Sequence, residues 1–261
     1  MSAETQSLAD ALRSRRSVRG FLDKPVPEET LKAIFELAQL APSNCNIQPW
    51  KVFVASGEVR DELRRRMVEK VTAGVPMEPD FEPNAGKFSG VYRQRQVDCA
   101  VELYNNMGIA RDDKPGRMRA QLRNFELFDA PHVVFIGMER EFGPTVALDV
   151  GMYIQSLMLA MTAYGVGSCA QGSMRYFPND VREIFGEPAS TAILVGMVAI
   201  NVIGLLSVLE AAFIAAGLLL VAIAVSARLL WRGRRHEEKP TGTPRVRVFW
   251  RPRKPRRMLA A

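Results

Sequence analysis

The chain contains little histidine and little cysteine, with two histidines and three cysteines among 261 residues. The cysteines, Cys45, Cys99 and Cys169, lie far apart, form no CxxC pair and have no histidine beside them, so no zinc-binding pattern is present. Three widely spaced cysteines also give no basis for a disulfide framework. We therefore expect reduced thiols, as in a cytosolic protein, and no bound metal.

The N-terminus lacks a secretory signal, because the segment that begins Met1 to Glu4 has no apolar run preceded by positive charge. Internal repeats of about 20 to 50 residues are missing too, which argues against solenoids and propellers. We expect the N-terminal part of the chain to form one domain in the cytoplasm.

The excess of positive charge is confined to the end of the chain. The formal net charge is +7, but the residues from Arg228 onward hold twelve Lys or Arg and only two Glu. Residues 1–227 therefore hold 23 basic and 26 acidic groups. Since the main part of the chain is mildly acidic, nucleic acid is not an expected partner.

Hydrophobic spacing predicts helices that alternate with strands. The expected helices cover residues 8–16, 27–37, 58–71, 91–107, 145–164 and 179–185, and the expected strands cover residues 51–55, 132–138 and 192–199. The run 132–138 is continuously apolar and predicts a strand covered on both faces. Helix 145–164 is nearly all apolar, so we expect it to be buried. The proline-rich and acidic stretch 76–90 predicts a loop or lid at the border of a site.

Two polar groups could bind a ligand. The first holds guanidinium groups and a hydroxyl at a helix end, which suits a phosphate, although such a run is often only a solvated helix end. Its residues are Arg15, Arg16, Ser17 and Arg19. The second concentrates amides and a hydroxyl between Pro42 and Pro49, which suits the edge of a heterocycle, although a polar turn explains it too. Its residues are Ser43, Asn44, Asn46 and Gln48.

A third group follows the long apolar helix, where small residues from Gly165 to Ser173 predict a glycine-rich turn that a ligand can approach closely. A helix C-terminus alone would also explain Gly165 and Gly167. In their order and spacing the three groups resemble the nitroreductase family of FMN enzymes, from about Leu8 to about Gly196.

The resemblance implies an α+β fold of three layers with a central, mainly antiparallel sheet. It implies a homodimer with FMN held between the subunits, and NAD(P)H as co-substrate. Hydride would pass from the nicotinamide through FMN to a nitroaromatic, a quinone or a similar small-molecule acceptor. Such a reaction needs no nucleophile, metal or acid from the protein, so we expect no catalytic side chain, and His132 is expected to be structural.

The resemblance also assigns roles to the three groups. Arg15, Arg16 and Ser17 would bind the FMN phosphate and ribityl chain, with Arg19 near the pyrimidine ring, where a cation stabilises negative charge. The second group would reach FMN from the partner subunit. Gln171, Gly172 and Ser173 would lie along the flavin, with their backbone amides near its N5 atom. An Asn and a Lys that many members place before the second strand do not align cleanly, since Arg123, Asn124 and Glu126 occupy that stretch.

Cys45 and Cys169 stand beside these residues, but they have no adjacent base or CxxC partner. We expect them to be small apolar groups without a redox role.

The resemblance stops near residue 197. Between Thr191 and Ala227 the only charged residue is Glu210, and Arg228, Trp231 and Arg232 follow at once. We therefore divide the chain into an FMN-binding domain 1–197, a hydrophobic, candidate transmembrane segment 198–231 and a basic tail 232–261 that is expected to be disordered.

Other origins of this C-terminus stay open: a buried helix in place of the family's closing arm, a reentrant hairpin around Glu210, and a frameshift or gene fusion. A single span would put the basic tail outside, against the positive-inside tendency. The alternative function is accordingly a non-enzymatic or impaired flavodomain remnant with a membrane-associating C-terminus. The expected location is a cytoplasmic flavodomain, associated with a membrane through that segment.

Overall fold

A computed structural model describes residues 6–22, 24–81 and 88–201 of the protein, and Leu8–Asn201 forms one compact unit. The described α-helices are α1 Leu8–Ser14, α2 Glu28–Ala38, α3 Gly57–Thr72, α4 Gly90–Asn106, α5 Lys114–Phe125, α6 Pro144–Ala163 and α7 Pro178–Phe185. The strands are β1 Lys51–Ser56, β2 His132–Glu139, β3 Val166–Gln171 and β4 Thr191–Asn201, and the 3-10 turns are η1 Asn44–Asn46, η2 Leu127–Asp129 and η3 Gly172–Tyr176. Of the segments 198–231 and 232–261, only residues 198–201 are described, as the end of β4, and the rest lies outside the described residues.

The four strands form one sheet in the order β1-β2-β4-β3, and every neighbouring pair is antiparallel. Phe135 of β2 lies opposite Phe53 on one side and Gly196 on the other. The predicted antiparallel sheet is confirmed.

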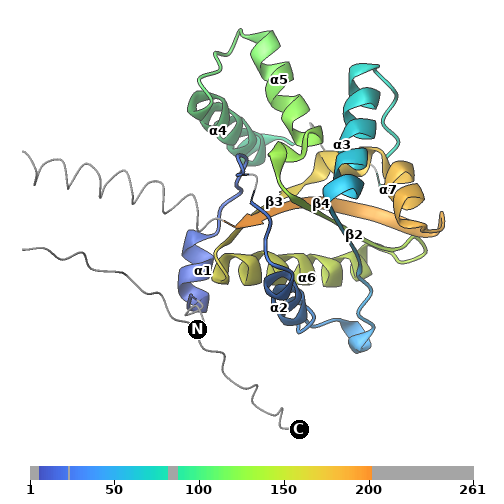
Figure 1. The fold of residues 1–261 in the computed structure, drawn as a ribbon. Coiled ribbons are helices and arrows are strands. Elements are labelled where there is room, and N and C mark those ends of the chain that lie inside the picture. Colours follow the sequence, from blue (N-terminus) through green and yellow to red (C-terminus); the bar gives the residue numbers. More distant parts are fainter. Residues whose placement is uncertain (1–5, 23, 82–87, 202–261) are drawn as a thin grey trace, which may run out of the picture. The chain divides into compact units, whose positions relative to one another are not determined.

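Side chains of β2 alternate between two hydrophobic cores, as the pleat of a strand requires. Val134 and Ile136 pack in the core that α2 and α6 cover, whereas Val133 and Phe135 pack in the core on the other face, with α3 and α7. Figure 1 shows α6 and α2 on one face of the sheet and α3 and α7 on the other. The three-layer α+β architecture and the prediction of a strand covered on both faces are therefore confirmed.

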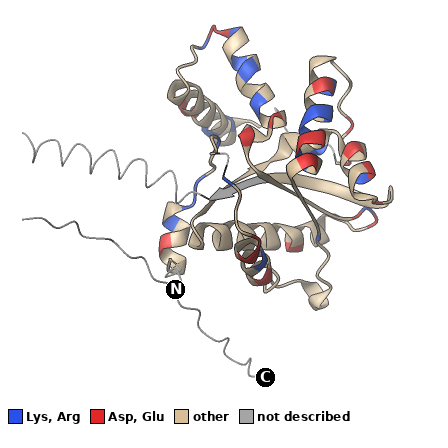
Figure 2. Cartoon of the chain, viewed as in Figure 1, with Lys and Arg blue, Asp and Glu red and all other residues tan. Residues whose placement is uncertain are grey.

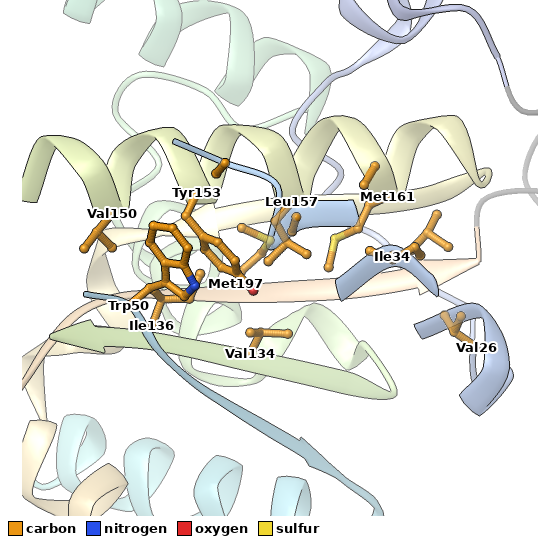
Figure 3. Close-up of a cluster of buried hydrophobic side chains, with 14 of the residues drawn as sticks. Val26, Ile34, Trp50, Val134, Ile136, Val150, Tyr153, Leu157, Met161 and Met197 are labelled. Atoms are coloured by element: carbon orange, nitrogen blue, oxygen red, sulfur yellow. The ribbon is translucent and has the colours of Figure 1, made fainter. Parts of the chain in front are cut away.

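Helix α6 provides much of the first core. Val150, Tyr153, Leu157 and Met161 recur every three or four residues and are fully buried. Tyr153 also stacks on Trp50, with 4.7 Å between the ring centroids, as Figure 3 shows. Burying each of these side chains stabilises the fold by about 1.5–3 kcal/mol.

The expectation that this helix is wholly buried is wrong for the single chain. Leu148 and Met152 are 68% and 40% exposed, and in Figure 2 α6 is almost entirely free of charged residues. Within the described ranges α6 is the one helix long and apolar enough to cross a membrane. Its packing on the sheet explains the apolar side chains of its buried face, and the exposed ones need another explanation.

Two elements were not anticipated. The prediction of a glycine-rich turn from Gly165 to Ser173 is wrong for most of that segment. Only Gly165 has the left-handed backbone of a turn, with φ 68°, and Val166 to Gln171 pair with β4 as a strand. Small residues pack here because the segment is buried beside its neighbours. Helix α5 was not predicted, since Pro115 and Gly116 lie in its first turn, where the Asp113 carboxylate caps the Gly116 N–H at 2.9 Å.

His132 joins three segments of the fold. Its Nε2 accepts a hydrogen bond from the Val26 N–H at 2.8 Å, so the proton resides on Nδ1, which donates to Ser56 Oγ at 2.5 Å. Burial lowers the pKa of the imidazole, and the positive charge of Arg60 lowers it further. His132 is therefore neutral and structural, as expected.

We predict that this histidine makes the protein less stable in mild acid. The pKa in the folded chain lies below the ordinary value of 6.5, so the unfolded chain binds the proton more readily. The stabilisation that neutral His132 provides is complete above about pH 6.5 and is lost as the pH falls towards the pKa of His132 in the folded chain. Midpoints of chemical unfolding at about pH 7.5 and 5.5 should differ less in His132→Gln than in the wild type. An equal difference in both proteins would contradict this role.

Candidate functional site

The structure brings the first and third polar groups together. Ser17 pairs with Ser168 of β3 in a parallel bridge, and the Val18 N–H donates to the Ser168 carbonyl at 3.1 Å. The segment after α1 therefore runs beside the strand that leads to Gln171. The sequence predicts that both groups bind one ligand, and in the structure the two groups lie close enough together to do so.

The first group contributes three cations, Arg15, Arg16 and Arg19. Among the described residues, no carboxylate lies within ion-pair distance of Arg15, Arg16 or Arg19, and Arg16, Ser17 and Arg19 are exposed. Unpaired guanidinium groups beside a hydroxyl form a surface that can bind a phosphate.

Cys169 lies beneath this cationic surface and is 2% exposed. Burial raises the pKa of its thiol, while the charge of Arg19, a hydrogen bond with Ser17 and the charge of Arg15 oppose that rise. Cys169 is thus the small buried group that we expected. Cys45, by contrast, is exposed, so the expectation of a small buried group does not hold for it.

Gln171 forms a corner between β3 and η3. Its side chain is buried, and its Nε2 donates to the backbone carbonyl and the side-chain Oδ1 of Asn124, both at 3.2 Å. Its Oε1 and the hydroxyl of Ser168 are buried without a hydrogen-bond partner within the described part of the chain. Such orphaned buried atoms are rare, and a bound ligand or water can supply the missing partner. Gly172 is exposed and Ser173 half-buried at this corner.

Asn124 is the site residue that sequence reasoning did not assign. It occupies the stretch before β2 that matched the family poorly, and only its contact with Gln171 connects it to the site. The neighbouring charges are engaged elsewhere, because Glu126 pairs with Arg119 and Arg123. Burial favours a higher pKa for Glu126, but the two arginines outweigh it and lower the pKa.

The backbone after this stretch is strained. Leu127, Phe128 and Asp129 have φ values of 58°, 50° and 63°, in the left-handed region that residues other than glycine avoid. Each costs about 1–3 kcal/mol, and such strain gathers at functional sites. Here it turns the chain from α5 into the central strand, next to the residue that contacts Gln171.

The second polar group forms a loop, Ser43–Gln48, which we call the amide loop. The Gln48 N–H donates to Ser43 Oγ at 3.0 Å, and Gln48 Nε2 donates to Asn46 Oδ1 at 2.9 Å. Cys45, Asn46 and Gln48 have φ values of 49°, 54° and 46°. The loop thus presents exposed amides on a strained, preorganised backbone.

The amide loop lies apart from the other two groups. The Asn44 N–H donates to Asp149 in the second turn of α6, whereas Ser17 pairs with Ser168, just beyond the other end of that helix. Asp149 and Ala163 are 14 positions apart on the helix, a rise of about 21 Å. Figure 1 shows α1 at one end of α6 and the segment that follows α2 at the other. One chain therefore does not bring all three groups together.

The loop predicted as a lid, 76–90, has neither helix nor strand in its described parts before α4 begins. Before residues 82–87 it is anchored by the buried Asp80, which pairs with Arg140 and with Arg182 (2.7 Å) and accepts the Ile193 N–H at 2.8 Å. Burial would raise the pKa of Asp80, but these donors outweigh it and lower the pKa. The start of the loop is therefore held on β4 and α7.

Comparison with known proteins matches residues 12–202 to the model of the nitroreductase family. The chain is 39% identical over 186 residues to nitroreductase NfnB of Mycolicibacterium smegmatis, covering 69% of this chain and 77% of that protein. It is 32% identical over 189 residues to 4-nitrobenzoate reductase of Nocardioides sp., covering 71% of this chain and 76% of that protein. The crystal structure of the FMN-dependent NfnB from Mycobacterium smegmatis in complex with NADPH superposes with a TM-score of 0.70 at 37% identity, over 75% of this chain and 89% of that one.

We predict that the three thiols differ in reactivity. Cys45 and Cys99 are exposed and should react quickly with a disulfide reagent, whereas Cys169 should react slowly because it is buried and its pKa is raised. The Cys45→Ser/Cys99→Ser variant isolates the slow thiol, and denaturation of the same sample should make it fast. A fast thiol in the native double variant would show that the cationic surface does not cover Cys169.

Proposed function

The chain belongs to the nitroreductase family, and from this membership we infer that it is an FMN-dependent oxidoreductase that uses NAD(P)H to reduce small-molecule acceptors. The observation that carries this function to the site is the set of cations Arg15, Arg16 and Arg19, which have no acidic partner among the described residues and lie beside β3 at the bridge between Ser17 and Ser168. It gives the chain a phosphate-binding surface where the family similarity requires one.

The residues present fit FMN. Arg15, Arg16 and Ser17 offer charged donors and a hydroxyl to the phosphate and ribityl chain. The orphaned oxygens of Ser168 and Gln171 provide buried polar atoms next to that surface. Bound FMN supplies the redox chemistry, because it takes a hydride from NAD(P)H and passes it to the acceptor.

The protein's own residues bind and orient in this mechanism. The guanidinium groups of the first group hold the phosphate, and the backbone at the exposed Gly172 and the half-buried Ser173 offers amide donors at the end of β3. The positive charge of Arg19 favours added negative charge on a neighbouring ring. The hydrogen bonds from the buried Gln171 to the half-buried Asn124 hold this corner in place.

We further propose that the active protein is a homodimer with each site built from two subunits. The amide loop lies at one end of α6 and the cationic group at the other, so the loop of one subunit would complete the site of its partner. The exposed apolar side chains support this assembly: Leu8 and Leu12 of α1 are 66% and 53% exposed, and Leu148 and Met152 of α6 also face solvent. An apolar surface of this kind suits burial in a subunit interface.

The proposed acceptor is a nitroaromatic compound, with quinones as a second class. Two of the relatives are named for the reduction of nitro compounds, one of them 4-nitrobenzoate. The flavodomain would work in the cytoplasm. Three further hypotheses rest on the charge pattern of the sequence alone. They are the association of residues 198–231 with a membrane, the domain division at 197 and 231, and the alternative of an impaired remnant.

We predict that the purified full-length protein is yellow and bleaches when NADPH or NADH is added without oxygen. A nitroaromatic acceptor should restore the colour, because the flavin is then reoxidised. Absorbance near the flavin maximum measures both steps, and a screen of nitroaromatic, quinone and halogenated acceptors with both nicotinamides ranks the substrates.

A protein that contains no flavin and cannot be reconstituted with FMN would contradict the function and favour the impaired remnant. Separating the same cells into soluble and membrane fractions locates the chain, and its presence only in the soluble fraction would exclude membrane association.

We predict that two inactive variants complement each other. Arg15→Ala/Arg16→Ala damages the cationic group, and Asn44→Ala/Asn46→Ala damages the amide loop, so each homodimer should lose activity. In a mixed dimer both defects fall into one site and the other site is intact. Random mixing should therefore recover about a quarter of the wild-type activity.

A site contained in one chain gives the opposite result, because each subunit of the mixed dimer would then keep its own defect. No recovery in mixed dimers, verified with two affinity tags, would overturn the two-subunit site.

A further inference from the structure

The amide loop needs support from outside itself. Three of its residues, Cys45, Asn46 and Gln48, have left-handed backbone that none of them favours by itself to the degree glycine does. Such conformations persist only where surrounding contacts over-determine them. The hydrogen bonds from Gln48 to Ser43 and Asn46 shape the loop internally, but they would move with it. A fixed position requires a contact with a rigid element.

Asp149 supplies that contact. Its side chain is buried, with the residue 6% exposed, and its Oδ2 accepts the Asn44 N–H at 3.0 Å across 105 residues of sequence. In the described part of the chain, no cation lies within ion-pair distance of this carboxylate. A buried charge without a cation depends on its hydrogen bonds, and a bond between a carboxylate and a backbone N–H is a strong one.

Helix α6 makes Asp149 a fixed reference point. Val150 and Tyr153, next on the helix, are fully buried in the core, and Tyr153 stacks on Trp50, two residues beyond the amide loop. Figure 3 shows Val150, Tyr153 and Trp50 gathered in this core. Both sides of the loop are therefore tied to the same stretch of α6, through Asn44 before the turn and through Trp50 after it.

The same stretch of α6 faces the proposed subunit interface. Leu148 and Met152 lie one residue before and three residues after Asp149, and both are exposed in the single chain. Asp149 thus relates the position of the amide loop to the surface that would contact the partner.

We propose that Asp149 is a positioning residue of the flavin site: through the Asn44 amide it holds the amide loop at the place where the loop meets the FMN of the partner subunit. The inference rests on the proposed function, and it adds a residue that lies outside all three polar groups of the sequence.

The test compares FMN retention in full-length holoenzymes that differ at one buried aspartate. Asp149→Ala should raise the dissociation constant for FMN about tenfold, as expected for loss of a charge-assisted hydrogen bond. Asp149→Asn should stay within about threefold of the wild type, since its carbonyl oxygen can accept the same N–H. Flavin fluorescence after dilution of each holoenzyme measures the released FMN.

Asp180→Ala is the matched control. Asp180 is equally buried, at 5% exposed, but it pairs with Lys70 (2.6 Å) in α3 and has no contact with the amide loop. It should lower the melting temperature without changing FMN affinity. The inference is overturned if Asp149→Ala retains FMN as the wild type does, or if both alanine variants weaken it equally. A wild type that binds no FMN would instead refute the proposed function, and the inference with it.

A second route covers the case in which Asp149→Ala does not fold. Asn44→Ala removes only a side chain, whereas Asn44→Pro also removes the N–H that Asp149 accepts, at a first helical position that tolerates proline. Asn44→Pro should bind FMN about tenfold more weakly than Asn44→Ala. In an Asp149→Asn background the difference in FMN affinity between the two Asn44 variants should persist, because the introduced amide oxygen still accepts the bond. Equal FMN affinities of the two Asn44 variants in the wild-type background would overturn the inference.

Discussion

The packing of α6 against the sheet is the constraint on which the rest of the structure depends. Its buried face, from Val150 to Met161, forms one of the two cores, and the stacking of Tyr153 on Trp50 ties β1 and the amide loop to it. Because the helix is rigid and about 30 Å long, whatever is attached to its ends is held apart. The candidate flavin-binding groups are attached there, so the length of one core helix sets the distance between them.

This layout divides the expected binding residues of one chain between two places. The cationic group and the end of β3 meet through Ser17 and Ser168, while the amide loop is held at Asp149. The apolar residues that α1 and α6 leave exposed in the single chain offer the surface on which a second copy would supply the missing loop. Cofactor binding and subunit association would then depend on each other.

Buried polar groups orient the segments that the sheet does not hold. Neutral His132 joins the loop before α2 to β1 and β2, and Asp80, with two arginines, fixes the start of the loop that precedes α4. Two strained turns, at Cys45 to Gln48 and at Leu127 to Asp129, end beside the amide donors and beside Asn124. Such backbone persists only where surrounding contacts over-determine it.

The sequence by itself determined the central strand 132–138, the long apolar helix and the three groups whose order indicates the family, because hydrophobic periodicity and short motifs are local properties. The three layers were expected from the family resemblance. Only the tertiary structure decided that Val166 to Gln171 is a strand, that Leu148 and Met152 stay exposed, that Asn124 contacts Gln171 and that Asp149 holds Asn44. These depend on contacts between residues 25 to 105 positions apart, or on which face of a helix meets the sheet. Neither propensity nor spacing contains that information.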